Sequence, residues 1–362
     1  MDHSEIEGEQ TLQAIEPELS SKGSGASLIA AGIFASRLLG LVRERVFAHY
    51  FGNSAAADAF KAALRIPNLM QNLFGEGVLS ASFIPVYSRF VAEGRREDAG
   101  KLAGALFTIL SLLVSTVVLI GVIFSPSLVD LITPGFEGER RQLCILLTQI
   151  FFPGVGLLVM AAWCLGILNS HRKFFLPYAA PVVWNVIVIF SLFWFGQSRV
   201  DSTLAIAVAW GSVAGSIAQF LVQLPSAVAA APPLQFAVKK GLDGLQLVMK
   251  NFFPVILGRG VLQISAFADG IIASLLPTGA VSALAYAQTI YLLPISLFAM
   301  SVSAAELPAM SRLRGADHEI AAALVKRVNI GSRQIAFFVI PSVVVFIALG
   351  DILIGAVFET GR

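Results

Sequence analysis

Charged and amide side chains follow one face of a predicted helix inside an otherwise apolar stretch of the sequence. Six polar residues recur there at intervals of three and four positions: Asp58, Lys61, Arg65, Asn68, Asn72 and Glu76. At about 100° per residue, they fall within roughly 80° of one helix face. An ionisable group costs several kcal/mol at the centre of a bilayer, so such groups face a wet cavity or one another. The pattern therefore predicts a polar substrate path through a membrane-embedded bundle.

A second polar sector lies on the helix predicted just upstream. It consists of Ser36, Arg37, Arg43 and Glu44, which share about 120° of the helix circumference. The planar guanidinium of arginine suits phosphate and keeps its charge when partly buried. Together the two sectors predict a cationic surface at membrane depth, which suits an anionic head group such as a phosphate or diphosphate.

The same charges have an alternative interpretation as internal ion pairs. Arg37 would then pair with Glu44, seven positions, or about two helical turns, further along the same helix. In the same way, Lys61 and Arg65 would pair with Asp58. Pairs of this kind only fix the packing of helices and bind no substrate.

The composition is that of an all-α polytopic membrane protein. Of the 362 residues, 56% are hydrophobic and 13% are charged, and the mean hydropathy is +0.79. A soluble domain carries about 25% charged residues. The sequence has no Gly-rich phosphate loop, no His-Glu-x-x-His motif and no Gly-x-Ser-x-Gly elbow. We therefore expect no enzyme, no metal or cofactor and no nucleic-acid partner, and we expect Cys144 and Cys164 to be packing residues.

Apolar stretches predict nine helices. Their expected ranges are 27–50, 58–88, 102–132, 142–168, 174–196, 203–224, 250–275, 281–306 and 334–358. Ahead of them, residues 1–25 hold six acids and one lysine, which predicts a disordered acidic cytoplasmic tail rather than a signal peptide. Ser282 heads a neutral polar stripe on the eighth predicted helix, where hydroxyls serve either a cavity or helix–helix contacts.

Lysine and arginine are distributed unevenly among the predicted loops. With the N-terminus inside, fourteen of them fall in cytoplasmic loops, whereas the outer loops hold Arg140, Arg141 and Arg199. Cytoplasmic loops carry an excess of basic residues in membrane proteins. We therefore expect a multi-pass membrane protein with a cytoplasmic N-terminus.

A short internal repeat indicates two lobes. Residues 83–89 and 306–312 share the pattern Ile or Leu, Pro, two variable residues and Ser-Arg, at an offset that spans six helices. Such an offset preserves orientation, as in parallel repeats. It predicts an N-terminal lobe at 26–224, a cytoplasmic interfacial linker at 225–249 and a partial C-terminal lobe at 250–362. Because this second unit has three of six helices, we expect a truncated sequence or a degenerate second lobe.

The motifs around the polar residues resemble one transporter family. They are the run from Ser36 to Glu44, Asp58-Ala59-Phe60, Arg65-Ile66-Pro67-Asn68-Leu69 and Leu73-Phe74-Gly75-Glu76-Gly77. These runs resemble the MurJ (MviN) family, the lipid II flippases of the MOP transporter superfamily. The resemblance implies a two-lobed MOP-type bundle of typically fourteen helices, with about nine present here. It also implies a place in the bacterial inner membrane and a cationic central cavity that moves lipid II from the inner to the outer leaflet by alternating access.

A substrate site follows from the motifs and the resemblance together. The expected substrate-binding residues are Ser36, Arg37, Arg43, Glu44, Asp58, Lys61, Arg65, Asn68, Glu76 and Ser282. Arg37 and Arg43 would bind the diphosphate, and Asn68 would bond the head group. The expected partners are lipid II or a related polyprenyl-diphosphate glycolipid, membrane lipids and a coupling monovalent ion.

The chain departs from the family pattern at three positions. Glu44 replaces the usual Asp, Gln71 stands where many members have Arg, and Thr289 stands where an essential cavity Arg is typical. Two alternative functions therefore stay open. One is a flippase or exporter for another polyprenyl-linked glycolipid, and the other is a non-transporting MurJ-like scaffold.

Overall fold

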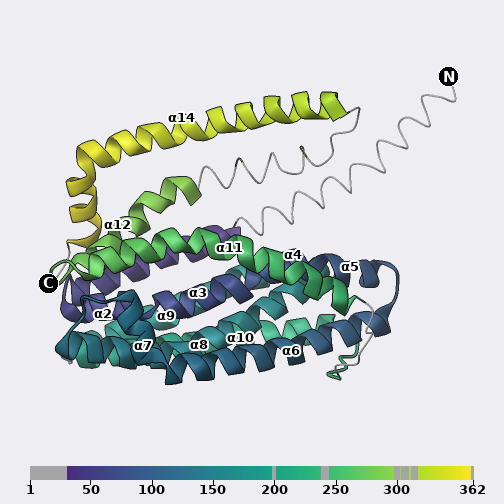
Figure 1. Cartoon of the computed structure of the whole chain (residues 1–362), viewed down its shortest axis with the longest axis horizontal. Helices are drawn as coiled ribbons and strands as arrows, with labels where there is room; N and C mark the ends of the chain where they lie inside the picture. Colours follow the sequence, from purple (N-terminus) through teal and green to yellow (C-terminus); the bar gives the residue numbers. More distant parts are fainter. Residues whose placement is uncertain are drawn as a thin grey trace.

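The computed structural model describes residues 31–197, 201–237, 244–296 and 317–359, together with the single positions 302 and 310. Within these ranges the chain is almost entirely helical and holds no strand. The long helices run roughly along one axis of the molecule (Figure 1). The predicted acidic tail, residues 1–25, lies outside the described residues.

Each of the nine predicted ranges contains helix. The first described helix covers residues 31–51. It is followed by α2 (Ala55–Ala63), α3 (Arg65–Phe74), α4 (Glu76–Ser82), α5 (Ile84–Ala92), α6 (Arg96–Ile123), α7 (Ser125–Ile132), α8 (Gly138–Ser170), α9 (Phe175–Gly196), α10 (Asp201–Ala230), α11 (Leu245–Ser274), α12 (Ala280–Pro294) and α14 (Asp317–Phe358).

Prolines divide two of the predicted helices. The prediction of one helix over 58–88 is wrong, because the structure divides this range into α2, α3, α4 and α5. Proline lacks an N–H, and its ring clashes with the carbonyl four residues earlier. Pro67 and Pro85 accordingly lie just after two of the interruptions. Pro126 likewise divides the predicted helix 102–132 into α6 and α7.

The last helix begins earlier than predicted. The expected range was 334–358, whereas α14 begins at Asp317. Its 42 residues trace about 63 Å along the helix axis, and the helix contains Pro341 and bends sharply before its C-terminal end (Figure 1). The charges at Lys326, Arg327 and Arg333 suggested a loop, but a helix can continue past the hydrocarbon core, where charged side chains reach water.

The segment between α10 and α11 is shorter than the predicted linker, 225–249. Helix α10 continues to Ala230, and α11 begins at Leu245. The described part of the connection lies against α6. The hydroxyl of Thr108 there donates to the carbonyl of Phe236 at 2.9 Å.

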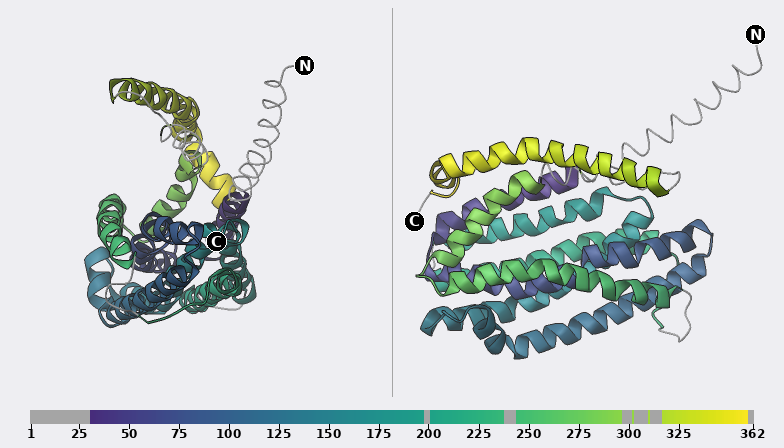
Figure 2. Two further views of the ribbon diagram at one scale, coloured as in Figure 1. Left: turned by 90° about the vertical axis from the view of Figure 1, so that its right-hand side faces the viewer. Right: turned by 45° about the horizontal axis from the view of Figure 1, so that its top comes forward.

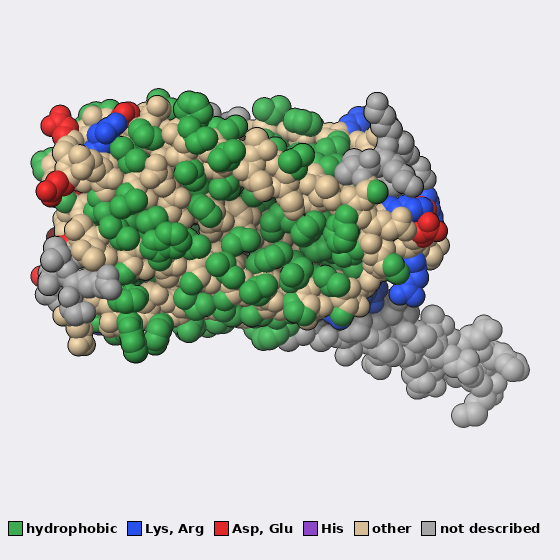
Figure 3. Space-filling view, turned by 90° about the horizontal axis from the view of Figure 1, so that it is seen from below, with side chains coloured by type: hydrophobic (Ala, Val, Ile, Leu, Met, Phe, Trp, Pro, Cys, Tyr) green, Lys and Arg blue, Asp and Glu red, His purple; other side chains and the backbone are tan. Residues whose placement is uncertain are grey.

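The surface has the character of a protein that spans a membrane several times. Among the described residues, α6, α8, α9, α10 and residues 320–358 of α14 are long and apolar enough to cross a bilayer. Hydrophobic side chains cover the face seen in Figure 3, and charged side chains gather at its two ends. Helices α12 and α14 stand apart from the compact bundle along most of their length (Figure 2), and they meet each other where the ring of Phe358 in α14 lies 5.0 Å from that of Tyr286 in α12.

Helix α8 forms the centre of the bundle and packs against α10, α6, α2 and α3. Trp163 in α8 is fully enclosed, and its Nε1–H donates to the carbonyl of Ala103 at 3.0 Å. Cys144 and Cys164 are completely buried in the core, which confirms that they are packing residues.

Gly75 permits the bend between α3 and α4. Its backbone has φ −88° and ψ −145°, and its N–H closes α3 by bonding to the carbonyl of Gln71. A Cβ on Gly75 would lie 2.2 Å from that same carbonyl oxygen. Any side chain here must therefore move the backbone and disturb the polar face that α3 and α4 share.

We predict that Gly75→Ala lowers the melting temperature of the purified protein, because overpacking costs about 1–3 kcal/mol. The matched control is Gly40→Ala in the first helix, where an added Cβ meets nothing within 4 Å. Thermal unfolding in detergent, followed by size-exclusion chromatography, measures both variants. Equal melting temperatures would show that the bend does not depend on glycine.

Candidate functional site

Glu44 lies at the centre of a charged network between three helices. Its carboxylate accepts a hydrogen bond from Arg43 Nη2 at 2.8 Å, and its second oxygen pairs with Lys61 of α2. Arg43 Nη1 also donates to Asn185 Oδ1 of α9 at 3.0 Å. Glu44 is 8% exposed, so a nearly buried anion connects two cations. We call Arg43, Glu44, Lys61 and Asn185 the Glu44 network.

Aromatic rings support both cations of the Glu44 network. The guanidinium of Arg43 lies 4.7 Å from the ring centre of Trp184. Lys61 Nζ lies 4.2 Å from the ring of Phe47, and its side chain is 9% exposed. A cation over an aromatic face is attracted by the ring quadrupole. Lys61 is therefore enclosed within the network, whereas Arg43, with 23% of its side chain exposed, reaches a cavity.

Asp58 connects α2 to the beginning of α12. Its carboxylate is fully buried and accepts hydrogen bonds from the N–H of Gly279 at 2.7 Å, the N–H of Ser282 at 2.8 Å and the hydroxyl of Ser282 at 2.9 Å. Arg140 Nη1 approaches the same carboxylate at 3.4 Å. Asp58 thus caps a helix that begins more than two hundred residues later, where a negative charge is favoured. We call Asp58, Arg140, Gly279 and Ser282 the Asp58 clasp.

Two arginines cross between α11 and the α3–α4 segment. A Cβ on Gly270 of α11 would lie 1.1 Å from Arg65 Nη1, so the guanidinium lies directly over this glycine. A Cβ on Gly77 of α4 would lie 1.9 Å from Arg259 Cζ in the same way. Each arginine also interacts electrostatically with an acid, Arg65 with Asp269 and Arg259 with Glu76. Glycine therefore makes room for a charged contact at two points along this seam.

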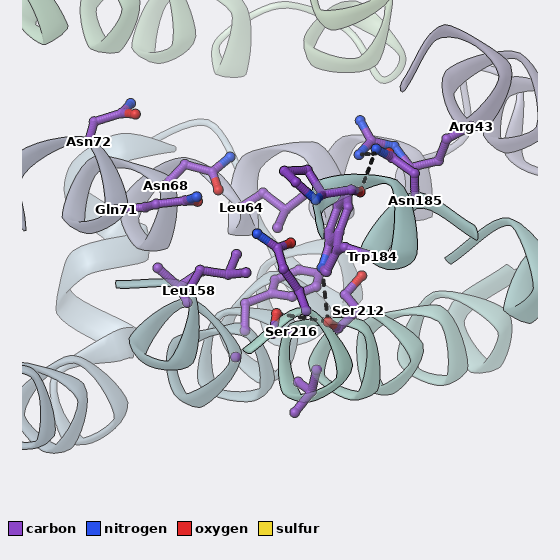
Figure 4. A pocket seen from close by; sticks show the side chains of 16 residues that line it. Arg43, Leu64, Asn68, Gln71, Asn72, Leu158, Trp184, Asn185, Ser212 and Ser216 are labelled. Atoms are coloured by element: carbon purple, nitrogen blue, oxygen red, sulfur yellow. Dashed lines mark hydrogen bonds between the residues drawn. The ribbon is translucent and has the colours of Figure 1, made fainter. Parts of the chain in front are cut away.

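A chamber of about 420 Å³ lies among α3, α8, α9 and α10, with Arg43 at one end (Figure 4). The polar part of its lining consists of Arg43, Asn68, Gln71, Asn72, Asn185, Ser212, Ser216 and Gln219. Gln71 and Asn72 also line an adjoining cavity of about 590 Å³, together with Glu76 and Arg259. The chamber therefore adjoins the seam between α4 and α11.

The predicted site residues fall into several groups rather than one cluster. Arg43, Glu44 and Lys61 form the Glu44 network, and Asp58 and Ser282 meet in the Asp58 clasp. The other five lie in different places. Asn68 lines the chamber, and Arg65 and Glu76 interact with residues of α11. The backbone carbonyl of Ser36 accepts a hydrogen bond from Asn185, and Arg37 is exposed on the first helix.

The ion pairs in the structure join other partners than the pairs Arg37–Glu44 and Lys61–Asp58 that the sequence suggested. Glu44 pairs with Arg43 and Lys61, and Asp58 pairs with Arg140. Arg140 appeared in the sequence only as a charge in an outer loop, so its contact with Asp58 was not expected.

One polar stripe that contributes to the chamber was missed in the sequence analysis. Helix α10 carries Ser212, Ser216, Gln219 and Gln223 at intervals of four, three and four positions, and the first three line the chamber. The signal was present, because the same spacing identified the stripe that begins at Asp58. Asn185, on α9, is an isolated amide whose contact with Arg43 follows only from the folded structure.

We predict that Glu44→Gln destabilises the protein by about 3–5 kcal/mol, because it leaves Lys61 and Arg43 without their anion in a buried setting. The matched control is Glu93→Gln, which removes an exposed i,i+4 pair with Arg89 and costs less than about 1 kcal/mol. Thermal unfolding in detergent compares the two. A second variant, Glu44→Gln with Lys61→Met, should recover part of the loss, and an unchanged melting temperature for Glu44→Gln would contradict the network.

The family model described as "Lipid II flippase MurJ" matches residues 47–362. "Probable lipid II flippase MurJ" of Vibrio cholerae is 30% identical over 354 residues, which cover 92% of this chain and 65% of the relative. The corresponding protein of Aquifex aeolicus is 34% identical, over 76% of this chain and 54% of the relative. The chain thus spans between 54% and 65% of the length of these two curated relatives.

Solved structures agree with the sequence comparison. "Lipid II flippase MurJ, inward closed conformation" superposes with a TM-score of 0.75 at 29% identity, covering 92% of this chain and 68% of the other. An inward-facing multidrug resistance MATE family transporter of the MOP superfamily superposes with a TM-score of 0.70 at 16% identity, covering 90% and 73%. The second likeness shows the fold, which is the predicted MOP-type helical bundle. By sequence and by structure, this chain belongs to the lipid II flippase MurJ family.

Proposed function

We propose that this protein is a flippase that moves lipid II from the inner to the outer leaflet of the bacterial inner membrane. The observation that carries the proposal is Arg43, a partly exposed guanidinium held at one end of a polar chamber in a MurJ-family bundle. A transporter needs such a group at membrane depth, because the charged head of a lipid must leave water without losing its counter-charge.

The Glu44 network would have N–H groups and positive charge available to bind a diphosphate. Arginine has five N–H groups, and Arg43 uses two of them for Asn185 and Glu44. Because Arg43 and Lys61 carry two positive charges against the single charge of Glu44, the network retains one net positive charge. Arg37 lies six residues earlier on the same helix and provides a second cation for the proposed site.

The Asp58 clasp supports closure at one end of the path. Three hydrogen bonds to its buried carboxylate join α2 to α12, and an ion pair joins the same carboxylate to Arg140 of α8. Basic residues are in excess in the predicted cytoplasmic loops, so the end of the bundle that holds these loops would be the inner end. The Asp58 clasp would then lie at the outer end. In Figure 3, blue side chains gather mostly at the right-hand end, which is the end of α5 in Figure 1 and lies opposite to α2. Alternating access would then require the Asp58 clasp to open when the head group is released outward.

The remaining partners follow from the same proposal. Membrane lipids would surround the polyprenyl tail of the substrate, which stays in the bilayer. A monovalent ion gradient or the membrane potential would drive transport, since the sequence has no Gly-rich loop of the kind that binds ATP.

A second candidate is transport of another polyprenyl-linked glycolipid. Gln71 lines the chamber, and Thr289 donates its hydroxyl to the carbonyl of Ala285 at 3.0 Å. Neither position supplies the positive charge that the MurJ family typically has there. Fewer cations favour a substrate with less negative charge than lipid II.

We predict that Arg43→Ala lowers lipid II export at least about tenfold, because one hydrogen bond to a charged group contributes roughly 1.5–3 kcal/mol. Bacteria depleted of their own lipid II flippase would carry the gene for this protein. Export is measured as the lipid II that becomes accessible at the outer leaflet.

The matched control is Arg45→Ala, which removes the same charge from an exposed position two residues away. It should export lipid II as the unaltered protein does. If Arg43→Ala also exports normally, Arg43 does not bind the substrate. If the unaltered protein reaches the membrane and exports no lipid II, the substrate is another lipid or the protein is a scaffold.

We also predict that Asp58→Asn opens the outer end of the path, because a neutral amide no longer pairs with Arg140 or offers two acceptor oxygens to α12. The measurement is labelling of Asn68→Cys by a membrane-impermeant thiol reagent added outside the cell. Labelling should rise several-fold in the double variant. Asp130→Asn is the control, since it removes an exposed pair with Arg141. Equal labelling in both backgrounds would mean that the clasp does not close this end.

A further inference from the structure

The connection between α7 and α8 has a shape that its own residues fix. It covers residues 133–137, and we call it the 133–137 turn. Pro134 presets the backbone φ angle at its second position, and the N–H of Phe136 donates to the carbonyl of Thr133 at 3.0 Å. The ring of Phe136 is buried in the same apolar cluster as Leu147 of α8. The turn therefore presents a rigid surface at this end of the bundle.

Gly135 of the 133–137 turn touches the end of α11. A Cβ on Gly135 would lie 2.1 Å from the carbonyl oxygen of Ser274 and 2.8 Å from Cα of Leu275. Side chains do not fit at such separations, so the two backbones meet directly. The N–H of Gly135 faces the hydroxyl of Ser274, with 3.5 Å between N and Oγ, and Ser274 is buried. Glycine thus permits a close contact between segments that are 139 positions apart in the sequence.

Arg140, in the first turn of α8, joins the 133–137 turn to Asp58. Its Nη2 donates to the carbonyl of Gly135 at 2.9 Å, and its guanidinium lies 4.0 Å from the ring centre of Phe136. Its Nη1 lies 3.4 Å from Oδ2 of Asp58, and its side chain is 14% exposed. Arg140 therefore fixes the turn and the Asp58 carboxylate relative to each other.

These groups together receive residues 274–279, where α11 ends and α12 begins. The contacts are Asp58 with the N–H of Gly279, Gly135 with Ser274, and Arg140 Nη1 with Thr278 Oγ1 at 3.4 Å. Each of them crosses between the two predicted lobes. Arg140 is closer to the carbonyl of its own turn than to Thr278, so it would stay with α8 when residues 274–279 move away.

The contact is of a kind that separates easily. Where Gly135 meets Ser274, the turn offers backbone atoms, and beside them it offers a guanidinium. Neither interlocks with a side chain of the other lobe, and the polar groups can exchange their partners for water at small net cost.

We propose that the 133–137 turn and Arg140 form a latch that holds the outer end of the path closed by receiving residues 274–279. Arg140 is a positioning residue, because it acts through the turn and through Asp58. This inference rests on the proposed function, which places this end outside and requires it to open. The latch adds to the Asp58 clasp a contact at Gly135 that does not involve the Asp58 carboxylate.

Gly135→Ala tests the latch without altering Asp58 or its hydrogen bonds. The added Cβ fits only when residues 274–279 have moved away, so this variant favours the open outer end. The measurement is labelling of Asn68→Cys by a membrane-impermeant thiol reagent added outside the cell. The matched control is Gly350→Ala in α14, where an added Cβ meets nothing within 4 Å.

We expect Gly135→Ala to raise the labelling at least about fivefold, because an overpacked contact shifts an equilibrium between closed and open states by this factor or more. Gly350→Ala should leave the labelling unchanged. Equal labelling in the two variants would overturn the latch.

The native thiols distinguish opening of the path from unfolding of the protein. Cys144 and Cys164 are buried in the core. In Gly135→Ala without the Asn68→Cys exchange, they should remain unlabelled, because only the contact between the lobes has opened.

If the native thiols do react in Gly135→Ala, Arg140→Lys replaces it. Lysine keeps the positive charge beside Asp58 but lacks the planar fork that spans Gly135 and Thr278. It should raise the labelling of Asn68→Cys as well, and labelling equal to that of the unaltered latch would overturn the proposal.

The latch and the proposed function fail in different ways. A protein that exports lipid II, but in which Gly135→Ala and Gly350→Ala are labelled equally, is a flippase without this latch. A protein that exports no lipid II, but in which Gly135→Ala raises the labelling, supports the latch in a transporter of another substrate.

Discussion

Glu44 holds two cations from different helices within a bundle of low dielectric, and the rest of the candidate site depends on this contact. Without the anion, Arg43 and Lys61 would repel each other at membrane depth. With it, Lys61 is enclosed between the rings of Phe47 and Tyr286, and Arg43 is turned toward Asn185 and the chamber. The Glu44 network therefore fixes where positive charge meets the polar path. A substrate with a diphosphate would meet a guanidinium whose position is already set by three partners.

The contacts between the N-terminal helices and α11 and α12 combine apolar packing with charged contacts. Val281 and Tyr286 of α12 and Phe252 of α11 belong to the same apolar clusters as residues of the N-terminal helices. Beside these contacts, α2 meets α12 through the Asp58 clasp, and α3 and α4 meet α11 through arginines that lie over glycines. Hydrogen bonds and ion pairs can exchange with water at small net cost, which would suit the proposed alternating access.

The sequence predicts much of this structure because its polar stripes obey helical periodicity. Charge spacing places Asp58, Lys61 and Asn68 on one side of their segment, and the motifs identify the family. Three features escape this reasoning. Pro67 interrupts the stripe, so Asp58 and Lys61 belong to a different helix from Asn68. The partners Arg140 and Asn185 come from distant helices that only folding brings together. The hydroxyl and amide stripe of α10 was overlooked because it carries no charge.

The central claim is that Arg43, positioned by the Glu44 network, binds a lipid II head group during its passage across the membrane. Purified protein reconstituted in vesicles with lipid II tests this directly. The measurement is the rate at which lipid II becomes accessible to a binding antibiotic outside the vesicles. The unaltered protein and Arg45→Ala should increase this rate, whereas Arg43→Ala should not. An increase of the same size with Arg43→Ala, or faster movement of a polyprenyl-linked glycan without the peptide, would contradict the account.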